Sequence, residues 1–319
     1  MTMNCAILDD YQQVAGAMAD WSALGGKVAV RSLAEHIGEP EALAAAIGDC
    51  EIVVIMRERT PFPAELFARL PKLKLLITTG MRNAAIDLRA AAAHGVVVCG
   101  TDSAATPPAE LTWALILGLA RQIAPENQAF RAGGPWQSTV GMDLSGRQLG
   151  LLGLGKIGAL VARVGLAFGM QVAAWSQNLT GERALACGAE LAPSKEALLE
   201  TSDIVSIHLV LSERTRGLLG APELRRMRPG AYLINTSRAA IVEQAALVEA
   251  LRGGWIAGAA VDVFETEPLP ASDSLRGLPT LLATPHLGYV TQDNYARYFG
   301  QAVEDIAAFL AGAPIRVLA

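Results

Sequence analysis

The chain has 319 residues, of which 52% are hydrophobic and 18% charged, and its formal net charge is −5. This length is enough for two domains with sizeable cores, and the apolar content excludes a disordered chain. No block of lysine or arginine is present, which argues against binding to nucleic acid or to a membrane surface. The four cysteines are widely spaced without a C-x-x-C pair, so we expect reduced, buried thiols in a cytoplasmic protein.

Short apolar runs that suit strands alternate with alanine- and leucine-rich stretches along the whole chain, which is typical of parallel α/β sheets. The strands expected in the first third are Asn4–Leu8, Lys27–Arg31, Ile52–Ile55, Leu75–Thr78 and Val96–Cys99. A second series begins at Gln148 and continues with Gln171–Trp175, Ile204–His208, Ala231–Asn235, Gly258–Val263 and Thr280–Ala283. Helices are expected at Glu41–Ile47, Ala64–Leu70, Pro108–Arg121 and Asp293–Leu310.

The most informative segment runs from Gln148 to Gly158. Apolar residues at 149–152 predict a buried strand, and the residues after the glycines predict a helix. Gly153, Gly155 and Gly158 have the G-x-G-x-x-G spacing of a dinucleotide-binding turn. In such a turn the first glycine permits the bend, the second lets the backbone approach a pyrophosphate, and the third allows close helix–strand packing. An ordinary glycine-rich turn is the alternative.

This turn lies in the middle of the chain, not at its start. The position predicts a nucleotide-binding domain inserted within another α/β domain. The outer domain would begin at Met1, run to about Gly100, and receive the last helix of the chain.

Three polar residues follow predicted strands of the second series, which is where ligands bind in open α/β sheets. Arg238 can hold a carboxylate by two parallel hydrogen bonds. His286 belongs to the residue type that changes charge nearest neutral pH, and a partner such as Glu267 can fix its tautomer. The pair suits proton transfer to a carbonyl oxygen as a hydride reaches the carbon. The simpler alternatives are a surface arginine, a solvated acid and a structural histidine.

Other titratable residues are less specific. Asp262 lies within an apolar run, where a carboxylate without a partner is costly, so we expect a specific donor beside it. His208 ends a predicted strand and can line a cofactor site, whereas we interpret His36 and His94 as structural. No metal-ligand spacing occurs, and we expect no metal.

Several motifs in fixed order give the chain its resemblance to a known family. The motifs are Leu149–Gly158, His208–Ser212 with Thr215, Met227–Gly230 with Asn235–Arg238, Ala260–Phe264 with Glu267–Pro268, and Thr284–Gly288. Over essentially its full length, the chain resembles the D-isomer-specific 2-hydroxyacid dehydrogenases, which include glyoxylate/hydroxypyruvate reductases and phosphoglycerate dehydrogenases.

The resemblance implies a fold of two doubly wound, parallel-sheet α/β domains. A Rossmann dinucleotide-binding domain at 102–286 would be inserted in a flavodoxin-like substrate domain made of 1–101 and 287–319. The family also implies an active site in the cleft between the domains, closure that excludes water, and a homodimer.

The same resemblance implies roles for individual residues. Arg238 would bind the substrate carboxylate, and His286 would be the acid–base group with Glu267 as its partner. The positions implied to bind the cofactor are Gly153, Gly155, Lys156, Ile157, Gly158, Ser176, Leu209, Val210, Thr215, Thr236, Ser237, Asp262 and Gly288. The loop residues Gly80, Met81 and Arg82 match the family's substrate loop and would offer backbone N–H groups to the carboxylate. Arg57 follows another strand of the first domain and Tyr289 comes just after the His286 motif, so their positions make them further candidates for substrate binding.

The chain departs from the family pattern at two places. Ser176 stands where an acid often holds the adenosine ribose and rejects a 2′-phosphate, and no arginine follows directly, although Arg183 lies not far along. The choice between NAD and NADP therefore stays open. Met81 and Arg82 replace a small residue and a glycine, which can narrow or charge the pocket. Arg57 and Arg59 can meet a second acidic group of a substrate, or they can pair with Glu58 and other surface acids.

We therefore expect an NAD(P)-dependent oxidoreductase that interconverts a small 2-oxo acid and its D-2-hydroxy acid, as glyoxylate or hydroxypyruvate reductases do. A dehydrogenase of another small anion, such as formate or phosphite, is one alternative. A nucleotide-sensing regulatory scaffold without turnover is the other.

Overall fold

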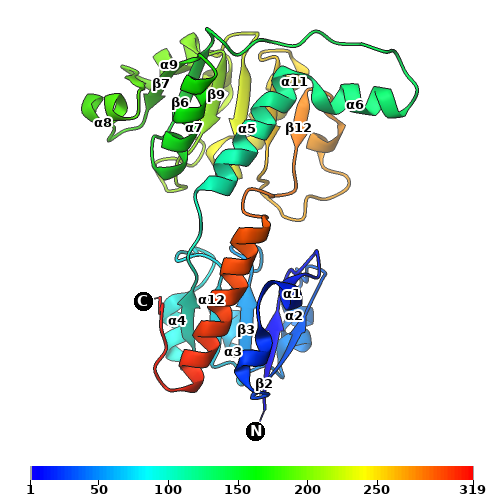
Figure 1. Cartoon of the computed structure of the whole chain (residues 1–319), viewed down its shortest axis with the longest axis vertical. Coiled ribbons are helices and arrows are strands. Elements are labelled where there is room, and N and C mark those ends of the chain that lie inside the picture. The colour runs from blue at the N-terminus through cyan, green and yellow to red at the C-terminus, as the bar shows by residue number, and fades with distance from the viewer. Residues whose placement is uncertain (1, 319) are drawn as a thin grey trace. The chain divides into compact units, whose positions relative to one another are not determined.

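The computed structural model describes residues 2–318 and divides into two compact units (Figure 1). The first unit comprises Met1–Ala104 and Val290–Ala319, and the second comprises Ala105–Tyr289. Both divisions fall a few residues beyond the boundaries expected from the sequence. The second unit is therefore continuous in the chain and is inserted into the first.

The first unit contains a five-stranded parallel sheet in the order β2-β1-β3-β4-β5. Its strands are β1 (Met3–Ile7), β2 (Val28–Ser32), β3 (Ile52–Ile55), β4 (Leu75–Thr78) and β5 (Val97–Gly100). Its helices are α1 (Ala15–Met18), the 3-10 helix η1 (Trp21–Leu24), α2 (Pro40–Ile47), α3 (Ala64–Ala68), α4 (Leu88–Ala93) and α12 (Gln292–Leu310). The strand order is that of flavodoxin-like folds, which confirms the expected architecture.

Helices on both faces of this sheet explain the composition of its strands. Every residue of β3 and β4 is buried, so these strands are continuous apolar runs and show no alternation. The long helix α12 belongs to this unit although it follows the inserted unit in the chain. Its buried side chains include Tyr298, Phe299 and Ile306.

The second unit contains a seven-stranded parallel sheet in the order β12-β11-β10-β9-β6-β7-β8. Its strands are β6 (Gln148–Leu152), β7 (Gln171–Trp175), β8 (Glu190–Leu191), β9 (Ile204–Ile207), β10 (Tyr232–Asn235), β11 (Gly258–Val261) and β12 (Leu281–Ala283). Numbered within the unit, six of these strands follow the Rossmann order 3-2-1-4-5-6, with β12 added beyond the sixth.

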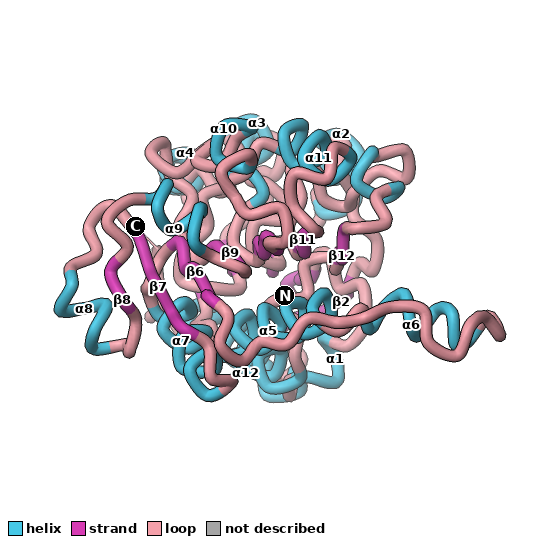
Figure 2. Tube along the Cα trace, turned by 90° about the horizontal axis from the view of Figure 1, so that it is seen from above, coloured by secondary structure: helices cyan, strands magenta, loops and turns pink. Residues whose placement is uncertain are grey.

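Helices cover both faces of the second sheet as well. The helices of this unit are α5 (Thr106–Ala120), α6 (Ile123–Arg131), α7 (Lys156–Ala167), α8 (Gly181–Ala186), α9 (Lys195–Thr201), α10 (Ala221–Leu224), α11 (Gln244–Arg252) and the 3-10 helices η2 (Ala239–Ile241) and η3 (Ser274–Gly277). Figure 2 shows the strands between α5 and α7 on one face and α9 and α11 on the other. Helix α6 instead projects from its unit, and none of its residues is buried (Figure 1). No helix of the described chain has the length and hydrophobicity needed to cross a bilayer.

Because all strands of each sheet are parallel, their carboxyl ends lie at one edge. In the second unit this edge carries the loops after β6, β7, β9, β10, β11 and β12. The candidate residues of that unit are therefore brought to a common edge by topology.

Candidate active site

The glycine turn after β6 has the geometry that a dinucleotide requires. Gly153 has φ +100°, and a Cβ there would lie 2.6 Å from the carbonyl oxygen of His208. A Cβ on Gly158 would collide with the carbonyl oxygen of Gly153, so helix α7 packs directly on the turn. Around Gly155, by contrast, nothing of the chain lies within 4 Å of such a Cβ. The fold thus requires glycine at 153 and 158, whereas Gly155 leaves space beside the backbone.

This open side faces the start of α7, which begins directly after Gly155. The first N–H groups of a helix have no acceptor within it, and the helix dipole favours negative charge there. Lys156 and Ile157 supply the first of these groups. Space, free donors and dipole fit the pyrophosphate of a dinucleotide.

His208 adjoins the turn from the end of β9. Its Nε2 atom lies 2.9 Å from the hydroxyl of Ser206, and burial lowers the pKa of its imidazole to about 4. Burial thus favours the neutral form of this imidazole beside the glycine turn.

A cavity of about 330 Å³ lies in the same unit at the carboxyl end of β7. Its lining residues are Trp175, Ser176, Gln177, Asn178, Leu209, Val210, Ser212, Arg214, Thr215 and Leu218. Four predicted cofactor residues, Ser176, Leu209, Val210 and Thr215, are thus brought to one cavity. Arg214 was not among the candidates. Its place in the cavity could not be predicted from the sequence, because it depends on a contact between distant segments. Nη1 of Arg214 donates a hydrogen bond to Oε1 of Gln177, 37 residues earlier in the chain, at 3.3 Å.

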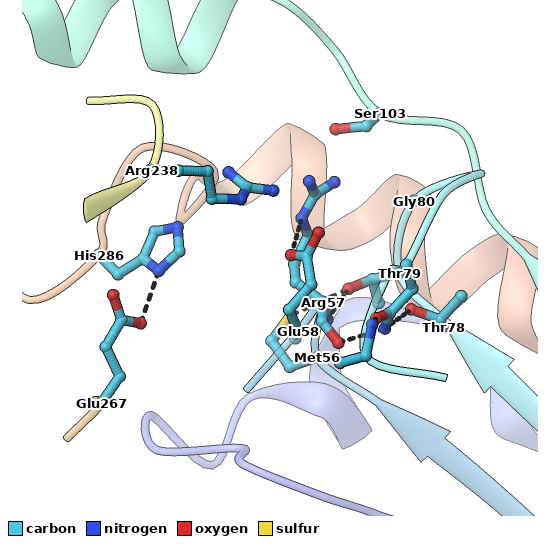
Figure 3. Close-up of polar contacts among 12 residues, drawn as sticks. Met56, Arg57, Glu58, Thr78, Thr79, Gly80, Ser103, Arg238, Glu267 and His286 are labelled. Carbon is cyan, nitrogen blue, oxygen red and sulfur yellow. Dashed lines mark hydrogen bonds and ion pairs between the residues drawn. The ribbon is translucent and has the colours of Figure 1, made fainter. Parts of the chain in front are cut away.

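His286 and Glu267 form the polar pair of the second unit (Figure 3). Nδ1 of His286 lies 2.7 Å from Oε2 of Glu267, and Oε1 of Glu267 accepts a hydrogen bond from the Phe264 N–H at 3.0 Å. Both side chains are about one-fifth exposed. The rings of Tyr289 and His286 are in T-shaped contact, with centroids 5.2 Å apart. The imidazole is therefore held on two sides, and its other nitrogen is left for chemistry.

The backbone of the same loop is unusual at His286, which has φ +54° after the end of β12. A non-glycine residue in this region is held there by its surroundings at a cost of about 1–3 kcal/mol. Asp262 supplies part of that restraint. Its Oδ1 accepts hydrogen bonds from the Leu287 N–H and the Thr284 hydroxyl, both at 2.7 Å, and its Oδ2 accepts from the Gly288 N–H at 2.8 Å.

Asp262 is 1% exposed, so the donors that its burial led us to expect are present. Burial raises the pKa of the Asp262 carboxyl, and the three hydrogen bonds act in the opposite direction. The structure thus gives Asp262 a role as an anchor for the His286 loop, besides the cofactor contact that the family implies.

Arg238 follows β10 in a turn that is organised by Asn235, which belongs to the Asn235–Arg238 motif but had no predicted role. The Asn235 amide donates to the carbonyl of Arg238 at 3.1 Å, and its Oδ1 accepts from the Ser237 N–H at 3.1 Å. The hydroxyls of Thr236 and Ser237 bond to Thr112 and to the Ile207 carbonyl. Arg238 is half-buried, and Figure 3 shows its side chain in the same close-up as His286 and Glu267.

The first unit brings its own candidates together at the ends of β3 and β4 (Figure 3). The Arg57 N–H donates to the Thr79 hydroxyl at 3.0 Å, and the Arg57 guanidinium lies against Gly80, which has φ +106°. Nε of Arg57 lies 3.6 Å from Oε2 of Glu58.

The backbone N–H groups of this loop are not equivalent. The Gly80 N–H donates to the Thr101 hydroxyl at 3.0 Å and is therefore occupied within the fold. Among residues 2–318, the N–H groups of Met81 and Arg82 have no acceptor, and both side chains are exposed. The donors available to a ligand are thus those of Met81 and Arg82.

Comparisons with known proteins place this geometry in a family. Residues 113–288 match the model of the D-isomer specific 2-hydroxyacid dehydrogenase NAD-binding domain. The glyoxylate reductase of Aeropyrum pernix is 39% identical over 257 residues, which cover 78% of this chain and 76% of that protein. The D-3-phosphoglycerate dehydrogenase of Bacillus subtilis is 37% identical over 265 residues, 82% of this chain but only 50% of that protein.

Solved structures agree. The phosphoglycerate oxidoreductase from Vibrio cholerae O395 superposes with a TM-score of 0.93 at 36% identity, covering 98% of this chain and 100% of that one. The resemblance found in the sequence is thus confirmed by domain model, relatives and fold. The chain belongs to the D-isomer specific 2-hydroxyacid dehydrogenase family and is an enzyme of that class.

Proposed function

We propose that this enzyme interconverts a small 2-oxo acid and its D-2-hydroxy acid, with His286 and Glu267 as the acid–base pair and Arg238 as the carboxylate clamp. The contact between Nδ1 of His286 and Oε2 of Glu267, at 2.7 Å, carries the proposal. A carboxylate on one ring nitrogen fixes the ring and leaves the other nitrogen to exchange a proton with substrate.

The nicotinamide cofactor supplies the hydride when it is bound. In the direction of reduction, protonated His286 donates the proton on Nε2 to the substrate oxygen, and Glu267 lies beside the positive charge of the ring before transfer. In the direction of oxidation, neutral His286 accepts the hydroxyl proton at the same atom. Arg238 binds the substrate carboxylate by its planar guanidinium, which orients the 2-oxo group.

We further propose that Arg57, Gly80, Met81, Arg82 and Tyr289 shape substrate binding. The free N–H groups of Met81 and Arg82 suit a carboxylate, and Arg57 suits a second acidic group. Glyoxylate and hydroxypyruvate are the first substrates to test, since the chain shares 39% identity with a glyoxylate reductase.

The experiment follows NADH and NADPH absorbance with purified protein and a panel of glyoxylate, hydroxypyruvate and larger 2-oxo acids. Turnover of one or more, lowered by about 10²–10⁴ in kcat for His286→Asn, supports the proposal. The matched control is His94→Asn, outside the site in the first unit. Turnover of formate or phosphite alone would favour a dehydrogenase of another small anion. Cofactor binding without any turnover would favour a regulatory scaffold.

We also propose a cytoplasmic homodimer. The four cysteines are free; Cys5, Cys50 and Cys99 are buried as expected, whereas Cys187 is only half-buried. Burial raises the pKa of the Cys99 thiol to about 11, as suits a reduced structural thiol. Projecting helix α6 and the segment after it expose Phe130 (69%), Trp136 (83%) and Val140 (98%) to solvent. A second copy of this chain would cover such a patch. Light scattering after gel filtration should give a dimer for the natural chain and a monomer for Phe130→Ser/Trp136→Ser.

A further inference from the structure

We propose that the enzyme prefers NADP(H) to NAD(H), and that Arg214 binds the 2′-phosphate of the adenosine ribose together with Ser176. The inference rests on the proposed dehydrogenase function and concerns the cofactor end of the same site. In Rossmann domains the group after the second strand contacts the ribose, and here that strand is β7.

The first observation is the absence of a carboxylate from the cavity at the end of β7. Of the residues that line it, Arg214 is the one charged side chain, and none is Asp or Glu. An acid at this place holds the ribose hydroxyls of NAD and repels a phosphate. Ser176 offers a hydroxyl instead, and within the described chain that hydroxyl has no hydrogen-bond partner.

The second observation is the placement of Arg214. It comes from the loop after β9, and its hydrogen bond to Gln177 brings the guanidinium to the residue that follows Ser176. Among residues 2–318, the exposed side chain of Arg214 forms no ion pair. A guanidinium has five N–H donors, so four remain for a ligand once Gln177 has taken one.

Arg214 therefore supplies the cation that the sequence lacks directly after β7. Arg183, the nearer arginine in the chain, lies on α8 and does not line the cavity. A planar guanidinium beside a hydroxyl and the amides of Gln177 and Asn178 suits a phosphate monoester, which accepts several hydrogen bonds.

The apolar part of the cavity suits the adenine. Leu209, Val210 and Leu218 line it, and Val210 is 77% exposed although it is apolar. A base placed against these side chains would set its ribose toward Ser176, at the end of the cavity where Arg214 is held.

The test measures binding of 5′-AMP and 2′,5′-ADP by calorimetry, because these probes carry the adenosine end and lack the nicotinamide. The natural chain should bind 2′,5′-ADP at least about tenfold more tightly than 5′-AMP, as expected for a charge-assisted phosphate site. Arg214→Gln should weaken the affinity for 2′,5′-ADP by roughly 10- to 100-fold and change the affinity for 5′-AMP by no more than about twofold.

Two further variants sharpen the result. Arg216→Gln removes the same charge from an exposed arginine of the same loop that does not line the cavity, and it should leave both affinities within about twofold. Ser176→Asp restores an acid and should reverse the preference. NADPH and NADH titrations of the same proteins should show the same order.

The outcomes separate the two proposals. Equal binding of both probes by the natural chain, or equal losses in Arg214→Gln and Arg216→Gln, would overturn this inference while the dehydrogenase function stands. Failure of all four nucleotides to bind would contradict the nucleotide site and, with it, the proposed function.

Discussion

Asp262 holds the loop that carries His286, with its two carboxylate oxygens on the N–H groups of the two residues that follow the histidine. The imidazole is thus positioned from two directions. Glu267 restrains the ring, and Asp262 restrains the backbone at its positive φ. The two acids act on different parts of one residue, so their removal should have different consequences.

Asp262→Asn tests the backbone restraint. The asparagine side chain keeps one oxygen as an acceptor, but its NH₂ group then faces a backbone N–H. A charge-assisted hydrogen bond is thus replaced by two donors that face each other. We expect a loss of about 1–3 kcal/mol in stability and a lower kcat. Denaturant titration and steady-state kinetics measure both. Asp143→Asn, on an exposed loop, should change neither. Unchanged stability in Asp262→Asn would remove the anchoring role.

Gly155 and Gly158 form a matched pair for the nucleotide turn. A methyl group at Gly155 meets nothing within 4 Å, so Gly155→Ala should keep stability within about 0.5 kcal/mol but obstruct the pyrophosphate. A methyl group at Gly158 collides with the Gly153 backbone, so Gly158→Ala should lose about 1–3 kcal/mol as well as cofactor affinity. Thermal melts and NADPH titration distinguish the two. Normal cofactor binding in Gly155→Ala would show that no pyrophosphate lies there.

Arg238→Lys tests the carboxylate clamp while keeping the charge. Lysine is a point charge and cannot make the two parallel bonds of a guanidinium. We expect kcat/KM for the 2-oxo acid to fall by roughly 10- to 100-fold, with cofactor affinity unchanged. Kinetics with varied substrate at saturating cofactor give the value. A fall in cofactor affinity equal to that in kcat/KM would place Arg238 at the cofactor instead.

Asp305 on α12 should make the stability of the first unit depend on pH. Its side chain is fully buried, with Oδ1 accepting from Nε of Arg316 at 3.0 Å, and Oδ2 has no hydrogen-bond partner within the described residues. Burial raises the pKa of the Asp305 carboxyl to about 7, although Arg316 acts in the opposite direction.

Because this pKa is higher in the folded than in the unfolded chain, the folded state binds the proton more tightly. The resulting stability is complete below the unfolded pKa of about 4 and is lost as pH rises through about 7. From pH 5 to pH 8, the natural chain should therefore lose up to about 3 kcal/mol relative to Asp305→Asn. Denaturant titrations at both pH values test this, with exposed Asp293→Asn as the control. If the free energy of unfolding changed with pH equally in the natural chain and in Asp305→Asn, a contribution of Asp305 to the pH dependence would be excluded.

The sheets could be predicted because strands that are buried on both faces of a parallel sheet have continuous apolar sequences. Ile52–Ile55, Leu75–Thr78 and Gln171–Trp175 match the predicted strands residue for residue, and other predicted strand ends shift by one or two residues. Strand β8 was missed because two residues carry no periodic pattern. Helix α6 was missed because it buries no residue and so has no apolar stripe facing a core.

Side-chain geometry was less accessible to sequence reasoning. The proximity of His286 to Glu267 was expected from the family, but the anchor at Asp262, the turn at Asn235 and the approach of Arg214 to Gln177 join segments distant in sequence. Likewise, nothing in the residue pattern showed that the Gly80 N–H is occupied by Thr101. Such contacts depend on which loops share a sheet edge, and that information appears only once strand order is known.

The insertion of one unit into the other sets an order for synthesis on the ribosome. Residues 105–289 form a continuous unit that can complete its own core as soon as it has emerged. The outer unit must wait, because α12, which contributes Tyr298 and Phe299 to its core, is translated after the whole insertion. The five strands of this unit are translated first, but α12 can pack against their sheet only after nearly two hundred further residues have been added.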